Sequence, residues 1–424
     1  MDRTLNFRSI RLVPSSIDRN VAAILLVNLI WTIPWGLIQP FLSPYFFELS
    51  NGDYFLTGLL NGIPFGTMIV SVFAFGWIVD KIGSKTVMIA GFITFIVLFI
   101  TLIFIKDPVL FFLDYVLMNS LLGGFNPAVW KYASLTNKKD IFGSMGAFIS
   151  LGYFLGAVLS GWIYDAAGMI ALFFLSLVVC MIGLFITLIS YDLRQSDQEL
   201  LASNSSNHST VNLDKSPSPS SITILFSSKI LVVLFVISII HNFQGAFAGL
   251  FTSIYFLEEL DTPAGLIGIV FGAATLAGTV ASHYVGKIGK NRGYKNILIG
   301  SYIAYFLVWS AFIVSMDYVF PALFYVIPVY VGLFVAAPAM VADSVPESKR
   351  GTLMGVLGAS QNLGLAAGAI LGGLLAGLQG TFRWNFVVSA ALSIILIVFI
   401  TIFLKEEKRT PTYSNTAPVA NFDA

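Results

Sequence analysis

Twelve apolar runs, each about 20 residues long, constrain what this 424-residue chain can fold into. A helix needs roughly 20 apolar residues to cross the hydrocarbon core of a bilayer, where every backbone amide must be paired within the protein. Hydrophobic residues make up 57% of the chain and charged residues only 11%, which excludes an ordinary soluble globule. The sequence therefore predicts an all-α membrane protein with twelve transmembrane helices. These begin near Val21, Tyr54, Thr86, Val109, Ile141 and Met169, and then near Ile230, Pro263, Asn296, Tyr318, Gly351 and Trp384.

The basic residues test this count, because Lys and Arg concentrate in the cytoplasmic loops of membrane proteins. With a cytoplasmic N-terminus and twelve crossings, 21 of the 23 Lys and Arg residues fall on one side, and only Lys106 and Arg383 fall on the other. We therefore expect a multi-pass protein of the plasma membrane with both termini in the cytoplasm. This topology explains the basic residues without a nucleic-acid partner and leaves the lipid bilayer as the surrounding medium.

One long polar interval divides the chain into two halves. Residues 191–229 are rich in Ser, Asn, Asp and Pro, which cannot build a core, so we expect a cytoplasmic linker there. The predicted organisation is a cytoplasmic N-terminal tail (1–20), a six-helix bundle (21–190), the linker (191–229), a second six-helix bundle (230–404) and a cytoplasmic C-terminal tail (405–424).

The two halves are copies of one another. At an offset of 210 residues, "FLSPYFFEL" (41–49) aligns with "FTSIYFLEE" (251–259), and the same offset pairs Gly76 with Gly286, Gly83 with Gly293 and Lys85 with Lys295. Because each copy has six crossings, both copies enter the membrane from the same side. The sequence thus predicts two parallel six-helix repeats related by an axis along the membrane normal.

The segment "GWIVDKIGSK" (76–85) resembles the loop between helices 2 and 3 of the major facilitator superfamily of secondary transporters. It matches that family's pattern at Gly76, Asp80, Lys81, Gly83 and Lys85, and "GAVLSG" (156–161) and "GAILGG" (368–373) are similar to its helix 5 pattern. The resemblance implies the fold of this superfamily and a cytoplasmic gate in which Asp80 pairs near the start of helix 11, around residues 349–352. The second copy has Lys290 in place of Asp80, so it lacks the carboxylate for an equivalent brace against helix 5.

The resemblance also implies a cavity lined mainly by helices 1, 4, 7 and 10. Polar and aromatic residues at helical spacing on those helices are the candidates for substrate binding, with hydrogen bonding between helices as the alternative for each. Trp35 and Tyr325 are the preferred aromatic candidates. The full set is Asn28, Thr32, Trp35, Gln39, Tyr115, Asn119, His241, Gln244 and Tyr325.

Ionisable residues inside a membrane are costly and therefore informative. Asp114 lies in the outer part of helix 4 on a different face from Tyr115 and Asn119, so it either extends to the outer surface or carries a proton. His241 is near the midplane and can titrate near neutral pH, but a neutral, hydrogen-bonded imidazole is equally compatible with its position. Both are proton-coupling candidates.

These residues predict a nearly uncharged cavity lined by aromatic rings and amides. We expect a monomeric secondary transporter, not an enzyme, that moves a small, largely uncharged organic solute by alternating access, with protons as a possible coupling ion. A proton-coupled drug-type exporter is the favoured form. The alternatives are uptake of a sugar-like or other neutral metabolite, and a sensor or lipid-handling protein built on the same helices. No cofactor or metal is expected, and the single cysteine, Cys180, excludes a cysteine metal cluster. An enzyme is not expected because no Ser/His or Asp/Asp pair lies at membrane depth.

Overall fold

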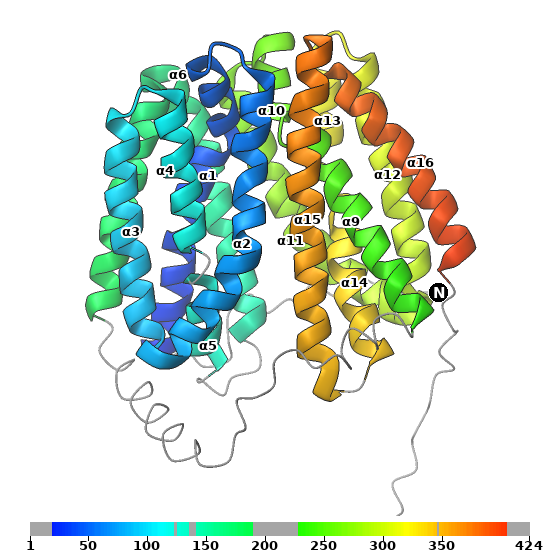
Figure 1. The fold of residues 1–424 in the computed structure, drawn as a ribbon, viewed down its shortest axis with the longest axis horizontal. Coiled ribbons are helices and arrows are strands. Elements are labelled where there is room, and N and C mark those ends of the chain that lie inside the picture. Colours follow the sequence, from blue (N-terminus) through cyan, green and yellow to red (C-terminus); the bar gives the residue numbers. More distant parts are fainter. Residues whose placement is uncertain (1–18, 123–124, 135–140, 190–227, 346, 405–424) are drawn as a thin grey trace, which may run out of the picture.

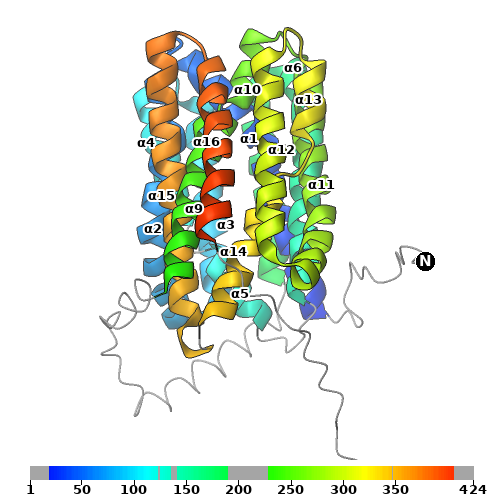
Figure 2. The same cartoon turned by 90° about the vertical axis from the view of Figure 1, so that its right-hand side faces the viewer.

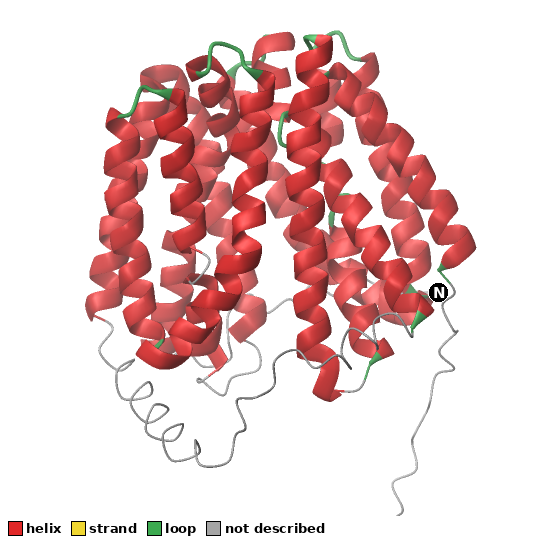
Figure 3. Cartoon of the chain, in the orientation of Figure 1, coloured by secondary structure: helices red, strands yellow, loops and turns green. Residues whose placement is uncertain are grey.

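The structure is a computed structural model that describes residues 19–122, 125–134, 141–189, 228–345 and 347–404. These residues form helices joined by short turns, with no strand among them (Figure 3). Nearly all of the expected N-terminal tail (1–20) and linker (191–229) lies outside the described residues, and so does the whole C-terminal tail (405–424).

The N-terminal half follows the predicted spans with two differences. Its helices are α1 (Arg19–Leu49), α2 (Tyr54–Ile82), α3 (Ser84–Phe104), α4 (Pro108–Leu122), α5 (Phe125–Ser134) and α6 (Ile141–Ile189). The fourth predicted span is covered by α4 and α5. The fifth and sixth spans are joined in α6, which changes direction at Gly168, where a φ of 72° favours glycine.

The C-terminal half repeats this order with two interrupted spans. Its elements are α9 (Lys229–Gly249), α10 (Thr252–Ile254), the π-helix η2 (Tyr255–Glu259), α11 (Ala264–Arg292), α12 (Tyr294–Val314), α13 (Val319–Tyr325), α14 (Val331–Ser344), α15 (Glu347–Gln379) and α16 (Arg383–Phe403). The seventh span breaks after Gly249. The tenth span breaks around Pro328, because proline has no amide hydrogen to donate within a helix.

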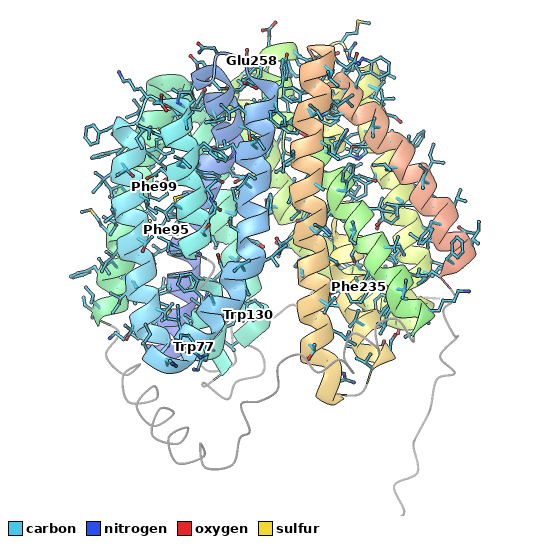
Figure 4. All side chains as sticks on the ribbon, in the orientation of Figure 1. Trp77, Phe95, Phe99, Trp130, Phe235 and Glu258 are labelled. Atoms are coloured by element: carbon cyan, nitrogen blue, oxygen red, sulfur yellow. The ribbon has the colours of Figure 1, made fainter. Side chains whose placement is uncertain are left out.

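The long helices run side by side between two faces of the molecule (Figures 1 and 2). We call the end where α1 begins and α16 ends the terminal face, and the end with the turns at 50–53 and 380–382 the opposite face. Trp77 and Trp130 lie toward the terminal face and Glu258 lies at the opposite face (Figure 4). Both indoles are about half exposed, as is usual for Trp at a membrane–water boundary.

The fold class predicted from the sequence is confirmed. Within the described residues, nine helices are long and apolar enough to cross a bilayer, and Pro108–Leu121 and Val331–Ser344 are shorter apolar helices. The exact number of twelve crossings remains a prediction.

Acidic residues at the opposite face start the helices that enter from it. The carboxylate of Asp53 accepts a hydrogen bond from the Leu56 amide at 2.9 Å, and Asp107 accepts from the amides of Val109 and Leu110 at 2.9 Å. Asp317 does the same for Val319 at 2.8 Å, before α13. A side-chain oxygen at this position satisfies amides that have no partner within the helix.

Glycines let equivalent helices approach closely in both halves. A side chain at Gly152 or Gly156 of α6 would collide with the backbone or a side chain of α1, and one at Gly364 or Gly368 of α15 would collide with α9. Small residues have this role in membranes because lipid supplies no hydrophobic force to press helices together. The repeat seen in the sequence is therefore a repeat of helix packing.

Candidate substrate cavity

Two pockets lie where the two halves meet, and Gln39 and Leu250 line both; we call them lobes 1 and 2 of a central cavity. Lobe 1 has a volume of about 320 Å³ and is lined by α1 and α6 from one half and by α9, α11 and the α13–α14 region from the other. Most of its polar groups are hydroxyls. They belong to Tyr153, Ser253, Thr275, Tyr325 and Tyr330, and Gln39 adds an amide.

Lobe 2 has a volume of about 260 Å³ and lies mainly within the N-terminal half. Trp31, Trp35 and Gln39 follow one another at intervals of four residues on α1, so they share one face of that helix. Pro64, Phe65 and Met68 of α2 form the facing wall, and Tyr115 and Asn119 of α4 complete it.

Neither lobe is lined by a charged residue or a histidine among the described residues. Five of the nine sequence candidates line the cavity: Trp35, Gln39, Tyr115 and Asn119 in lobe 2, and Tyr325 together with Gln39 in lobe 1. The cavity is therefore suited to a solute without a net charge, because a buried charge would find no opposite charge there.

Asn28 and Thr32 lie on the predicted stripe of α1 but not on the cavity wall. The Asn28 amide donates to the Ile24 carbonyl at 2.9 Å, and the Thr32 hydroxyl donates to the Asn28 carbonyl at 2.9 Å. Thr32 also lies directly against Gly152 of α6. Thr32 thus faces the packing between α1 and α6, and the Asn28 amide is bonded within α1.

His241 and Gln244 lie inside the C-terminal bundle. His241 Nδ1 is 3.1 Å from the Tyr302 hydroxyl, and its ring also packs against Tyr305. Gln244 is fully buried, and neither its amide oxygen nor its amide nitrogen has a hydrogen-bond partner in the described part of the chain. The structure therefore does not bring these two residues to either lobe.

Asp114 is held between α3 and α4. Its Oδ1 is 2.8 Å from Thr101 Oγ1, and its Oδ2 is buried with no hydrogen-bond partner among the described residues. Thr101 Oγ1 is also 2.7 Å from the Leu98 carbonyl oxygen, and a hydroxyl has one proton to donate. A protonated Asp114 would donate to Thr101, which would then donate to Leu98, and both short contacts would be satisfied.

Helices α6 and α11 also line lobe 1, through Tyr153, Phe271 and Thr275, which were not among the residues predicted from the sequence. Gly245 and Gly249, which line lobe 1 from α9, were not predicted either. The internal repeat could have identified these two glycines as lining residues. At the offset of 210 residues they align with Trp35 and Gln39, so the second copy has space where the first has side chains.

The cavity is closed toward the opposite face by contacts between the halves. The Tyr54 hydroxyl donates to the Gly380 carbonyl at 2.9 Å, and its ring lies 5.0 Å from that of Phe382. On the other side of the molecule, the Gly265 amide donates to the Asp165 carboxylate at 3.2 Å, where α11 begins. A carboxylate is favourable at this position because the start of a helix carries a partial positive charge.

Toward the terminal face, α2 and α15 separate. A Cβ atom at Gly58 of α2 would lie 2.8 Å from the Ala369 carbonyl oxygen of α15, and one at Gly62 would lie 2.9 Å from that of Ala366. One turn further along, a Cβ atom at Gly66 would meet no atom within 4 Å. Figure 1 shows α2 and α15 diverging in this direction. The halves are therefore closed together at the opposite face and apart at the terminal face.

The decapeptide 76–85 comprises the end of α2, the connecting Gly83 and the start of α3, and its second copy comprises the end of α11, the connecting Gly293 and the start of α12. Gly83 has φ 86° and ψ 154°, and Gly293 has φ 89° and ψ 149°, a conformation that requires glycine. Lys85 Nζ donates to the Leu188 carbonyl at 3.3 Å, and Lys295 Nζ donates to the Thr401 carbonyl at 2.9 Å. Each lysine thus caps the last helix of its own half. The side chain of Asp80 lies outside the described part of the structure, and Lys81 lies over the Trp77 ring at 3.6 Å.

The model of the Major Facilitator Superfamily matches residues 24–333 and 234–422. The multidrug resistance protein MdtG of Dickeya zeae (strain Ech586) is 26% identical over 189 residues, which are 43% of this chain and 46% of that protein. The match thus spans about half the length of this curated relative.

Solved structures share the fold at low sequence identity. The nucleoside transporter NupG superposes with a TM-score of 0.74 at 15% identity and covers 92% of this chain and all of its own. The peptide transporter POT in complex with alafosfalin has a TM-score of 0.66 at 15% identity and covers 92% of this chain and 96% of its own.

Proposed function

Because the chain belongs to the major facilitator superfamily, we propose that it carries a small, largely uncharged organic solute across the plasma membrane by alternating access. The observation that carries this proposal is the absence of charged side chains from the walls of both lobes within the described residues. The halves would rock about the cavity, so that it opens to one side of the membrane at a time. The chain would act as a monomer without a cofactor.

The topology inferred from the basic residues predicts on which side of the membrane each face lies. The terminal face would be cytoplasmic and the opposite face external, so the described conformation would be open to the cytoplasm. The decapeptide around Asp80 would then brace the terminal face when the cavity opens outward. In that state Asp80 would approach the start of α15, near residues 349–352.

We favour proton-coupled export, and Asp114 is the first candidate for the proton. Among the aspartates and glutamates whose side chains the structure describes, it alone is partly buried rather than exposed, and its contacts with Thr101 suit a protonated carboxyl. His241 is the second candidate. The partial similarity to a protein named for multidrug resistance supports the export direction.

Uptake of a neutral, hydroxyl-bearing metabolite is the second candidate function. The hydroxyl groups in lobe 1 favour it, because a polar solute must replace the hydrogen bonds that it made with water. The fold shared with NupG, which is named as a nucleoside transporter, is compatible with this direction.

A flux assay in proteoliposomes tests the proposal. Under an imposed pH gradient, a panel of uncharged aromatic and polyol solutes should include at least one with saturable flux, and the sign of the flux distinguishes export from uptake. Trp35→Ala should raise the KM for that solute about tenfold or more, which corresponds to ~1.4 kcal/mol. Trp384→Ala is the matched control, because Trp384 is exposed on α16 away from both lobes. Equal effects of the two substitutions would remove Trp35 from the site, and no saturable flux of any solute would overturn the function.

A further inference from the structure

We propose that the natural solute has two chemically different parts, a ring bearing several hydroxyl or amide groups that occupies lobe 1 and an aromatic or aliphatic group that occupies lobe 2. Aryl glycosides and nucleosides have this composition. The inference rests on the proposed function, since it specifies what the transporter would carry.

Lobe 1 offers hydrogen bonds that the protein does not use. The side chains of Gln39, Tyr153, Ser253, Tyr325 and Tyr330 make no hydrogen bond to another described residue, and all of them line the lobe. Hydroxyl and amide groups can both donate and accept, and they come from both halves of the molecule. Such a wall matches a solute with several hydroxyl groups, each of which needs a partner on leaving water.

Lobe 2 differs from lobe 1 in the side chains that line it. Half of its lining residues are the apolar Trp31, Trp35, Pro64, Phe65 and Met68, which include two indole rings. Two of its amides are already engaged: Asn119 donates to the Tyr115 carbonyl at 2.9 Å, and Asn61 donates to the Ser43 hydroxyl and the Thr57 carbonyl at 3.0 Å. The third amide, that of Gln39, also lines lobe 1. An aromatic or aliphatic group would bury its surface there against the two indoles and the apolar side chains of α2.

The sizes of the lobes favour one solute that spans both. Pockets for small molecules have volumes of roughly 300–1,000 Å³. Lobe 1, at about 320 Å³, is at the lower end of this range, and lobe 2, at about 260 Å³, is below it. Together they fall within the range, and Gln39 and Leu250 line both, so they are adjacent.

The internal repeat explains how two unlike lobes arose from copies of one unit. Trp35 and Gln39 in the first copy align with Gly245 and Gly249 in the second. A Cβ atom at Gly245 would meet no atom within 4 Å, so this glycine is not required for helix packing. Its small size leaves space in lobe 1, whereas the indole of Trp35 forms the apolar wall of lobe 2.

Calorimetric binding to the purified full-length protein tests the inference. The probes are phenyl glucoside, phenyl galactoside and a purine nucleoside, each compared with its two separate parts: phenol or the free base, and the methyl glycoside or ribose. We expect at least one joined compound to bind about tenfold or more tightly than either of its parts.

Substitutions in each lobe should then separate the two contributions. Gly245→Leu fills lobe 1 and should reduce the affinity of the joined compound to that of its aromatic part, whose own affinity should not change. Trp35→Ala should weaken the aromatic part and leave the methyl glycoside or ribose unaffected. Gly300→Leu is the control, because Gly300 is exposed on α12 and a Cβ atom there would meet no atom within 4 Å.

Three results would overturn the inference: no joined compound binds more tightly than its parts, Gly245→Leu and Trp35→Ala weaken all probes alike, or Gly300→Leu has the effect of Gly245→Leu. The flux assay distinguishes this failure from that of the proposed function. Saturable flux of a one-part solute without any gain from joining would refute the two-part solute alone. Joined compounds that bind as expected but show no flux would refute transport and leave the two-lobe site standing.

Discussion

A methyl group at Gly58 should shift the protein away from the conformation described here. In this conformation the Cβ atom of Gly58→Ala would lie 2.8 Å from the Ala369 carbonyl oxygen and 2.9 Å from Gly373 Cα. Non-bonded carbon contacts are most favourable at about 3.5–4.0 Å, and both neighbours are backbone atoms that cannot rotate away. Excess packing of this kind costs ~1–3 kcal/mol.

The cost applies only while α2 and α15 are in contact, so separating the halves at the opposite face relieves it. A difference of ~1–3 kcal/mol between two states changes their ratio about 5- to 150-fold. Gly66→Ala provides a matched control on the same helix, because its methyl group would meet no atom within 4 Å.

Thiol accessibility can measure this shift. Ser253→Cys places a reporter in lobe 1, and Cys180, which is buried, contributes the background measured without the reporter. A membrane-impermeant thiol reagent added at the opposite face should label the reporter faster in Gly58→Ala by a factor in the range given above. Equal labelling rates in Gly58→Ala and Gly66→Ala, with both variants folded, would refute the argument that the Gly58 contact holds the opposite face closed.

Three further predictions concern charged groups. Asp165→Asn should raise the labelling rate of the same reporter about 2- to 5-fold, because a carboxylate at the start of a helix contributes ~0.3–1 kcal/mol. An unchanged labelling rate would show that the contact between Gly265 and Asp165 does not stabilise closure of the opposite face. Asp114→Asn should abolish solute accumulation driven by a pH gradient but preserve solute exchange without a gradient. His241→Gln should preserve both activities, because His241 is hydrogen-bonded to Tyr302 away from the lobes. The reverse pattern would assign the proton to His241. Lys85→Met and Lys295→Met should each lower the free energy of unfolding by ~0.3–1 kcal/mol, because each removes a contact with the end of a helix. Thermal unfolding in detergent measures this effect. A melting temperature equal to that of the unsubstituted protein would exclude a capping role.

The fold was predictable because its determinants are local or periodic. Run length and basic loops predict helices across a bilayer, and the register of Gly83 with Gly293 predicts a doubled unit. The breaks were harder to foresee. Pro328 interrupts a span, but Pro34 and Pro64 lie within continuous helices, because neighbouring helices can accommodate proline in a membrane.

The cavity was only partly predictable from the same reasoning. Periodicity identifies the residues that share a face of a helix, but it does not identify what that face meets. Trp35 and Thr32 belong to one predicted stripe, yet the indole borders lobe 2 and the hydroxyl lies against Gly152. Gln244 has the composition of a ligand-binding residue and lies between helices of its own bundle. Only tertiary structure distinguishes these cases.

The contacts of Lys85 and Lys295 have a consequence for how the chain can be divided. Each lysine joins the third helix of its half to the last, so these contacts connect elements within a half and none of them joins one half to the other. A cut anywhere between Ile189 and Lys229 would leave both intact. We therefore expect residues 1–189 and 229–424, produced as two separate polypeptides in one cell, to associate in the membrane and restore flux.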